Sequence, residues 1–193
     1  SISGGIERRI DLRLATLRIG EIEEACILTP EGFLPIRAVR DARGESWPVD
    51  TMDLLKSGSF HGVRVWYAKH GGGLSRELSA RVIPARDARL APLFRRPRKI
   101  WGIGLNYRAH AADLNETSPT TEPASFMKPD TTIIGPGDTI RIPRLSSKTT
   151  GEAELGLVFA KEFRSPSNGD WRDVLAGYVS IIDMTAEDIL RIA

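Results

Sequence analysis

The chain has 193 residues, of which 41% are hydrophobic and 27% charged, and its formal net charge is +2. This ordinary globular composition can bury a sizeable core in one large domain or two small ones. The small net charge argues against a dedicated nucleic-acid binder, and no apolar run reaches the roughly 18 residues of a membrane helix, so neither nucleic acid nor membrane is expected as a partner. The single cysteine excludes an internal disulfide and, with no signal-peptide pattern at the start, favours a cytoplasmic location.

The first part of the chain predicts a small N-terminal α/β domain. Alternating apolar residues, turn signals and proline or glycine boundaries define its elements. Strands are expected at residues 9–19, 24–28, 33–39 and 63–67, and a short helix at 51–57.

A proline-punctuated segment at residues 91–97 predicts a joint between two domains, 1–95 and 96–193. The distribution of charge supports a division. Residues 1–99 carry 18 Lys and Arg against 12 Asp and Glu, whereas residues 100–193 carry 9 against 13. The acidic second half is therefore better suited to a cation site.

The sequence of the second domain predicts mainly strands joined by polar turns. The whole chain is therefore expected to be of the α+β class and mostly β. Its expected strands, in chain order, are residues 99–104, 139–142, 152–160 and 176–183. One or two turns of helix are expected at 107–114, a surface loop at 115–124 and a short helix at 171–176.

Three carboxylates in this half predict a divalent-metal site. Side chains alternate along a strand, so Glu152 and Glu154 face the same side, and Leu155 faces the opposite side, toward a core. Asp183 ends the next apolar strand. Three hard oxygen ligands suit Mg²⁺, Mn²⁺ or Ca²⁺ better than Zn²⁺. The alternative is a solvated strand face, which is the usual role of an isolated pair of glutamates.

His110 and Asp113 are three residues apart and share one face of the predicted helix. A carboxylate beside an imidazole orients it and raises its basicity, which predicts a water-activating general base. A chance surface pair is the alternative. One other pattern carries little weight: Gly102 and Gly104 lack the third glycine of a dinucleotide fingerprint, because position 107 is Tyr.

Five motifs in order resemble the fumarylacetoacetate hydrolase family, in its acylpyruvase-like and 2-hydroxyhepta-2,4-diene-1,7-dioate isomerase-like members. They are GLNYRAHA from Gly104, FMKP from Phe126, GPGDTI with Pro143, EAEL from Glu152, and GY at 177–178 with DMTA from Asp183. Each motif alone is weak, but their shared order across residues 100–188 makes the resemblance specific.

The resemblance implies a mixed β-roll as the catalytic domain and a homodimer. It implies that Mg²⁺, or Mn²⁺ or Ca²⁺, is held by Glu152, Glu154 and Asp183, where it chelates a small 2-oxo acid and stabilises the enolate formed during the reaction. In the family's hydrolases a His-Glu pair activates water, and these roles map to His110 and Asp113. Substrate contacts map to Tyr107, Lys128 and the position of Glu187.

The resemblance therefore implies an enzyme that hydrolyses a C–C bond in an acylpyruvate-like substrate. The alternatives are an isomerase or an oxaloacetate-type decarboxylase of the same family, or a degenerate homologue without catalytic activity. Asp113 stands where the family has Glu, and Glu187 where it has an Arg that holds the anionic substrate, so that Glu187 is expected to repel this substrate. The β-roll is expected to be incomplete at its C-terminal end, because relatives continue past the position of Ala193.

Overall fold

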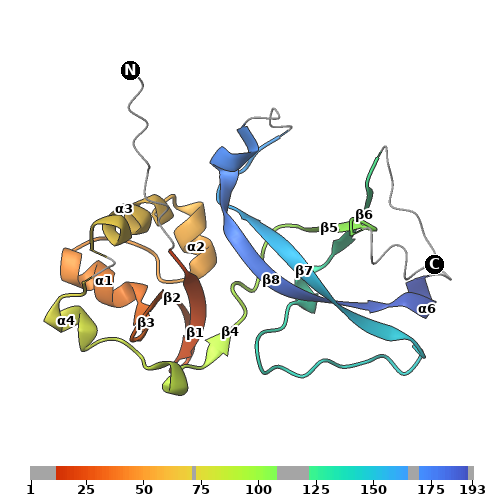
Figure 1. The fold of residues 1–193 in the computed structure, drawn as a ribbon, viewed down its shortest axis with the longest axis horizontal. Helices are drawn as coiled ribbons and strands as arrows, with labels where there is room; N and C mark the ends of the chain where they lie inside the picture. Colours follow the sequence, from red (N-terminus) through yellow and green to blue (C-terminus); the bar gives the residue numbers. More distant parts are fainter. Residues whose placement is uncertain (1–11, 71–72, 108–121, 165–169, 191–193) are drawn as a thin grey trace.

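The structure is a computed structural model that describes residues 12–70, 73–107, 122–164 and 170–190. Figure 1 shows a small helix-covered sheet on one side and a long two-stranded ribbon with a shorter strand pair on the other. The predicted mixture of helices and strands, with substantial strand content, is confirmed. Among the helices of the described ranges, none combines the length and the apolar character needed to cross a membrane.

The N-terminal sheet is antiparallel and has the strand order β3-β2-β1-β4. Its strands are β1 (Leu14–Ile19), β2 (Ile22–Thr29), β3 (Gly32–Pro35) and β4 (Leu90–Ala91). β4 comes from far along the chain and pairs Ala91 with Thr16 of β1. This pairing closes the N-terminal unit before the chain enters its second half.

The helices of this unit follow β3 in the chain. They are α1 (Ile36–Arg43), α2 (Thr51–Lys56), α3 (Phe60–His70) and α4 (Arg76–Ser79), followed by the 3₁₀ turn η1 (Ala85–Asp87). The helix predicted at residues 51–57 is confirmed as α2. Asp50 caps it by accepting a hydrogen bond from the Asp53 amide at 2.9 Å, which satisfies one of the free N–H groups of the first turn.

One strand predicted from the sequence, and the second part of another, are helical. β3 ends at Pro35, and residues 36–39 of the predicted strand belong to α1, where Ile36 and Val39 share a fully buried face. Residues 63–67 lie inside α3, where Val63 and Trp66 are likewise three apart and buried. Short runs of β-branched and aromatic residues fit either period, and packing of a helical face against the sheet decides here.

The hydrophobic core lies between the N-terminal sheet and its helices. It is built from buried side chains of β2, β3 and the helices, namely Ala25, Ile27, Leu34, Ile36, Ala38, Val39, Trp47, Leu54, Val63, Trp66 and Leu78. Glu24 is also buried, and its carboxylate is satisfied by the Arg37 amide and guanidinium, each at 3.0 Å. The charge is therefore paired, as a buried carboxylate requires.

The second half contains two separate antiparallel strand pairs. β5 (Ile100–Gly104) pairs with β6 (Ala124–Lys128), and β7 (Thr149–Phe159) pairs with β8 (Leu175–Ala186). The short elements around them are η2 (Asp130–Thr132), η3 (Asp170–Val174) and α6 (Glu187–Leu190). The strands predicted at residues 99–104, 152–160 and 176–183 are thus confirmed, with longer bounds for the last two.

The strand predicted at residues 139–142 is wrong. The segment is irregular, and Ile140 and Ile142 are 45% and 60% exposed. No neighbouring strand of the described residues pairs with it, so the backbone hydrogen bonds that would make it a strand are missing.

Contacts near the predicted joint fasten each of its ends to its own half of the chain. Arg95 donates to the Glu23 carboxylate of β2 at 2.6 Å, and Arg98 pairs with Glu162 beyond β7 at 2.7 Å. The hydrogen bond from Arg95 is the main reason that the pKa of Glu23 lies below its usual value. Gly135 lies so close to Pro92 that a Cβ at that position would be 2.5 Å from the proline Cδ.

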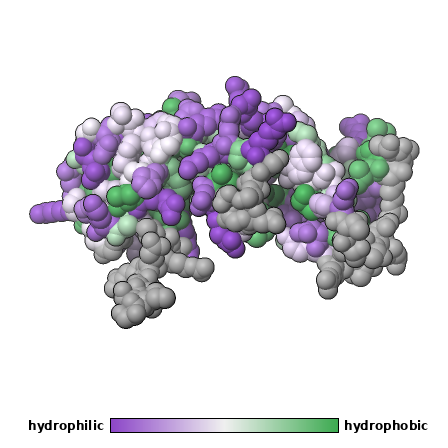
Figure 2. Space-filling view, turned by 90° about the horizontal axis from the view of Figure 1, so that it is seen from above, coloured by the Kyte–Doolittle hydropathy of each residue, from purple (hydrophilic) through white to green (hydrophobic). Residues whose placement is uncertain are grey.

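One face of the β7–β8 ribbon is apolar and exposed. Its large side chains are Leu155, Leu157, Phe159, Tyr178 and Ile182, which are 44–70% exposed. The prediction that Leu155 faces away from the glutamates is correct, but within the described residues no core covers it. Figure 2 shows hydrophobic surface on this C-terminal part of the molecule.

Gly32 provides a test of the N-terminal packing. Its φ is 143°, and an added Cβ would lie 2.3 Å from the backbone carbonyl oxygen of Ile83. We expect Gly32→Ala to lower the unfolding free energy by about 1–3 kcal/mol, because strain and steric overlap add. Gly20→Ala is the matched control, with positive φ but nothing within 4 Å of the new Cβ. Equal losses for the two variants in urea unfolding would contradict the packing argument.

Candidate metal and substrate site

The predicted carboxylates lie on one face of the β7–β8 ribbon. Glu152 is directly opposite Asp183 in the antiparallel register, and Glu154 is opposite Ile181, two residues further along. Side chains directly opposite one another have Cβ atoms about 4.5–5.5 Å apart. Two residues that are 31 positions apart in the sequence are therefore side by side. All three carboxylates are only partly exposed.

Alternation along both strands produces this face. On β7 the half-buried residues are every second one, from Glu152 through Glu154 and Gly156, while the residues between them are exposed. At Gly156 a Cβ would lie 2.4 Å from the Ile181 Cδ1, so the Ile181 side chain occupies the space beside this glycine. Its missing side chain leaves room for Ile181 to lie across β7 next to Glu154.

Lys128, at the end of β6, connects the β5–β6 pair to the carboxylates by contacting Asp183. Its ammonium donates to the Asp183 carboxylate and to the Met184 carbonyl oxygen, the latter at 2.9 Å. The Asp183 side chain is only 15% exposed. A residue predicted to contact substrate is thus bound to a residue predicted to hold the metal, although 55 positions separate them in the sequence.

The donor set fits a hard divalent cation in its chemistry, since it consists of three carboxylates on neighbouring positions of one surface. The side chains do not converge, however. Within the described ranges no three Asp, Glu, His or Cys side chains are grouped closely enough to hold an ion. Glu154 is two residues further along the ribbon than Glu152, and the Lys128 ammonium contacts Asp183. A shared ion requires these side chains to turn toward one another.

Glu187 is buried where the ribbon ends and α6 begins. Its side chain is 11% exposed, and its Oε2 is 2.5 Å from the Lys148 ammonium, whose side chain is 56% exposed. The Glu187 amide also donates to the Lys148 carbonyl oxygen at 2.9 Å. The charge that was expected to repel an anionic substrate therefore faces a cation.

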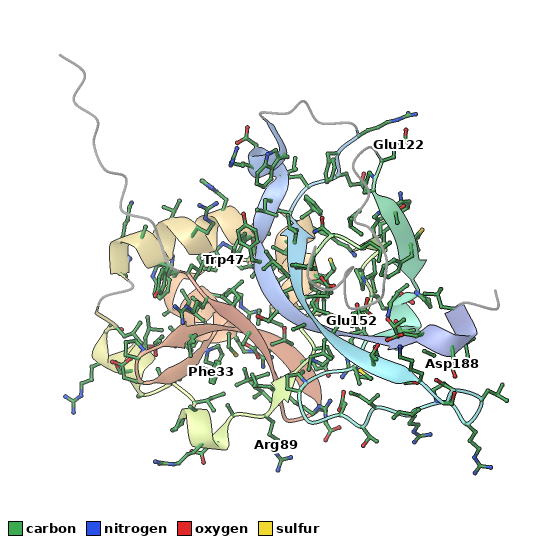
Figure 3. The ribbon with its side chains drawn as sticks, turned by 45° about the vertical axis from the view of Figure 1, so that its right-hand side comes forward. Phe33, Trp47, Arg89, Glu122, Glu152 and Asp188 are labelled. Carbon is green, nitrogen blue, oxygen red and sulfur yellow. The ribbon has the colours of Figure 1, made fainter. Side chains whose placement is uncertain are left out.

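Asp188 fastens the segment before β7 to the end of β8. Its carboxylate accepts hydrogen bonds from the Ser146 hydroxyl at 2.8 Å and from the Ser147 amide and hydroxyl at 2.6 and 2.8 Å. The bond from the Ser147 amide, followed by those from the two hydroxyls, holds the pKa of Asp188 well below its usual range. Figure 3 shows Glu152 on β7 and Asp188 in α6, toward one end of the same ribbon.

Three residues near the site were not found from the sequence: Lys148, Thr150 and Asp188. The alternation that connects Glu152 with Glu154 also extends backward to Thr150, and it could have identified this residue, whereas Lys148 precedes β7. Asp188 shows no such signal, because its partners come from a segment with no regular secondary structure.

The remaining predicted residues are less well placed. Tyr107 follows β5 and is 42% exposed. His110 and Asp113, together with most of the predicted loop at 115–124, lie outside the described residues. Their predicted roles therefore rest on the sequence.

Comparison with known proteins identifies relatives of the second half. Residues 99–193 match the family model described as fumarylacetoacetate (FAA) hydrolase, C-terminal. A protein of Archaeoglobus fulgidus is 41% identical over 93 residues, which is 48% of this chain and 37% of that protein. A mitochondrial oxaloacetate tautomerase of Xenopus laevis is 39% identical over 99 residues, which is 51% of this chain and 30% of the tautomerase.

The fold as a whole is also found in solved structures. Maleylpyruvate hydrolase from Sphingobium sp. SYK-6, in complex with manganese(II) and pyruvate, aligns with a TM-score of 0.65 and 26% identity, over 90% of this chain and 58% of that one. The chain spans less than half the length of the two curated relatives above. The named relatives are enzymes, a hydrolase and a tautomerase.

The contacts of Asp188 predict a specific pH dependence of stability. Folding lowers the pKa of Asp188. Its contribution to the unfolding free energy is therefore fully present above the pKa of the unfolded state, near 3.9, and is lost as the pH falls toward the pKa of the folded state. We expect the difference in unfolding free energy between wild type and Asp188→Asn to be constant above about pH 5 and to shrink below about pH 4. A difference that is the same at pH 3 and pH 6 in chemical denaturation would show that the Asp188 contacts do not persist in solution.

Proposed function

Because residues 99–193 belong to the fumarylacetoacetate hydrolase family, we propose that the protein is a divalent-metal-dependent enzyme that acts on a small 2-oxo acid. The observation that carries this proposal is the position of Glu152 directly opposite Asp183, with Glu154 on the same face. Isolated surface glutamates have no reason to be matched across a strand pair by a third carboxylate, since like charges placed directly opposite repel. A cation between them removes this cost.

In this proposal Glu152, Glu154 and Asp183 hold the ion, which is Mg²⁺, Mn²⁺ or Ca²⁺. When bound, the ion supplies a Lewis acid that polarises the 2-oxo acid. Binding of manganese(II) and pyruvate by the maleylpyruvate hydrolase supports this choice of ion and ligand class.

Lys128 is the residue best placed to bind the substrate carboxylate. Its ammonium is already held against Asp183 and the Met184 carbonyl, so it stands at the edge of the carboxylate face with its position fixed. An ammonium there compensates the negative charge of an incoming 2-oxo acid. Tyr107, at the end of β5, is a further candidate for contact with the substrate.

His110 is proposed as the general base and Asp113 as the residue that orients its ring. The imidazole takes a proton from water, and the resulting hydroxide attacks the carbonyl carbon that is not part of the 2-oxo acid. The C–C bond breaks with its electron pair moving into the 2-oxo acid fragment, which is then protonated. The products are two carboxylic acids, one of which keeps the 2-oxo group.

A second candidate reaction is oxaloacetate-type tautomerisation or decarboxylation, and the 39% identity to an oxaloacetate tautomerase favours it. It needs proton transfer at a carbon next to the 2-oxo group but no attacking water. A non-catalytic homologue is the third possibility. Turnover of acylpyruvate, oxaloacetate or neither by the full-length protein separates the three.

Further parts of the proposal concern the assembly and the location. The apolar face of the ribbon supports a β-roll and a homodimer, because exposed patches of this kind mark surfaces that are covered in the working protein. Cys26 is buried, and desolvation raises its thiol pKa to about 12, so the thiol is unreactive. As the single cysteine of this sequence it has no internal disulfide partner, which fits a reducing cytoplasm.

The metal site is tested by removing its ligands one at a time. We expect Glu152→Gln, Glu154→Gln and Asp183→Asn each to weaken Mn²⁺ binding by at least about tenfold. Changing a residue that only orients a metal ligand already lowers metal affinity or activity by about 10–100-fold. Isothermal titration measures the affinity. Glu162→Gln is the matched control, because Glu162 is 86% exposed and pairs with Arg98 away from the carboxylate face. Unchanged affinity in all three ligand variants would overturn the metal site.

The role of His110 is tested separately from the metal. We expect His110→Ala to lower hydrolysis of an acylpyruvate by about 10²–10⁴-fold, the usual contribution of a general base, while Mn²⁺ affinity stays within error of wild type. The same variant assayed for oxaloacetate tautomerisation shows whether the two reactions share the base. Full hydrolytic activity in His110→Ala would remove this assignment.

A further inference from the structure

Thr150 lies on the carboxylate face of the ribbon, one step before Glu152. It precedes Glu152 by two residues on β7, so alternation puts the two side chains on the same side of the strand. Across the ribbon, Thr150 is opposite Thr185 and Glu152 is opposite Asp183. On this side the carboxylate pair is therefore followed by two neutral hydroxyl groups.

The hydroxyl group of Thr150 is buried without a partner. Its Oγ1 is closed to solvent and makes no hydrogen bond with any of the described residues. A buried hydroxyl normally bonds to a protein group, a water or an ion, because the loss of its bonds to bulk water is otherwise uncompensated. Since this atom has no surface open to a water molecule, an acceptor on a neighbouring side chain is the simplest way to satisfy it.

Of the two carboxylates next to this hydroxyl, Glu152 is the better placed acceptor. Neighbouring side chains on one face of a strand have Cα atoms roughly 7 Å apart, and the glutamate can bridge this step by rotation about its side-chain bonds. Asp183 lies on the diagonal across the ribbon and has a shorter side chain. It also already accepts a hydrogen bond from the Lys128 ammonium.

The same rotation serves the proposed cation. Within the described part of the chain the carboxylates do not converge on a common point, so Glu152 has to turn before it can share an ion with Asp183. A carboxylate that accepts a hydrogen bond through one oxygen keeps its other oxygen for the ion. Hydrogen bonds to a charged acceptor are also stronger than those between neutral groups. One movement therefore satisfies the buried hydroxyl and directs the carboxylate.

We propose that Thr150 is a positioning residue of the metal site, whose hydroxyl donates a hydrogen bond to the Glu152 carboxylate and holds it in the orientation that binds the divalent cation. This rests on the proposed function and adds a residue beyond the three carboxylates. Lys128 holds Asp183 in the same way, so the ligand on each strand has a donor of its own. Thr150 contacts neither the ion nor the substrate.

The test is Thr150→Val, which replaces the hydroxyl by a methyl group of similar size. We expect the affinity of the full-length protein for Mn²⁺, measured by isothermal titration, to fall by about tenfold or more, as for other residues that orient metal ligands. Thr150→Ser keeps the hydroxyl and should keep most of the affinity.

Urea unfolding separates the positioning role from a purely structural one. Without metal, Thr150→Val should leave the unfolding free energy unchanged or raise it, because a buried hydroxyl without a partner is removed. At a fixed Mn²⁺ concentration the variant should gain less stability than the wild type, because the gain depends on the affinity. An equal loss of stability with and without Mn²⁺ would show a structural role and would overturn the proposal.

Two further variants serve as controls. Thr149 is the next residue of β7 toward its start, and its hydroxyl lies 2.7 Å from the Ser146 hydroxyl, so Thr149→Val should keep the Mn²⁺ affinity. In Glu152→Gln the effect of Thr150→Val should shrink, because a neutral amide accepts a weaker hydrogen bond than a carboxylate. Unchanged affinity in Thr150→Val, or an undiminished effect in Glu152→Gln, overturns the positioning role.

These outcomes are separable from a failure of the proposed function. If Glu152→Gln weakens Mn²⁺ binding and Thr150→Val does not, the metal site stands and the positioning role is wrong. If Thr150→Val weakens Mn²⁺ binding but the wild type converts no 2-oxo acid, the reaction is wrong and the positioning role stands. A wild type that binds no Mn²⁺ overturns both.

Discussion

The alignment of β7 with β8 is the constraint on which the candidate site depends. Glu152 meets Asp183 only because the two strands pair in this register, and a slip by one residue would send one strand's carboxylates to the opposite face. Gly156 contributes to the alignment, because it admits Ile181 across the ribbon. The register of the backbone pairing therefore determines which side chains share this face.

The contacts beyond the ribbon all act on this alignment. Lys128 joins β6 to Asp183 near the middle of the face, and the Lys148–Glu187 pair joins the two strands at its end. Asp188 ties down the segment that leads into β7. The Lys128 and Lys148 ammonium groups compensate the charges of Asp183 and Glu187, respectively.

The elements best predicted from the sequence were those with clear alternation. β7, β8 and β5 follow from their patterns, and so does the shared face of Glu152 and Glu154. Residues 36–39 and 63–67 were predicted wrongly, because short apolar runs fit a helix as well as a strand until the sheet offers a surface to pack on. Asp183 was expected to join these glutamates from its place at the end of the next apolar strand and from the family resemblance, but the register that places it opposite Glu152 was not predicted. The contact of Lys128 with Asp183 and the bonds of Asp188 depend on tertiary structure and have no counterpart in sequence spacing.

The apolar side of the ribbon has a consequence for the carboxylate side. Leu155, Leu157, Phe159, Tyr178 and Ile182 are the reverse of the same two strands that carry Glu152 and Asp183. Whatever covers these side chains stabilises the strand pairing, and so it also favours the arrangement of the carboxylates behind it. By thermodynamic linkage, an ion bound on one side and a surface packed on the other strengthen each other, although they never touch. The pairing of β7 with β8 therefore couples the apolar face of the ribbon to its carboxylate face.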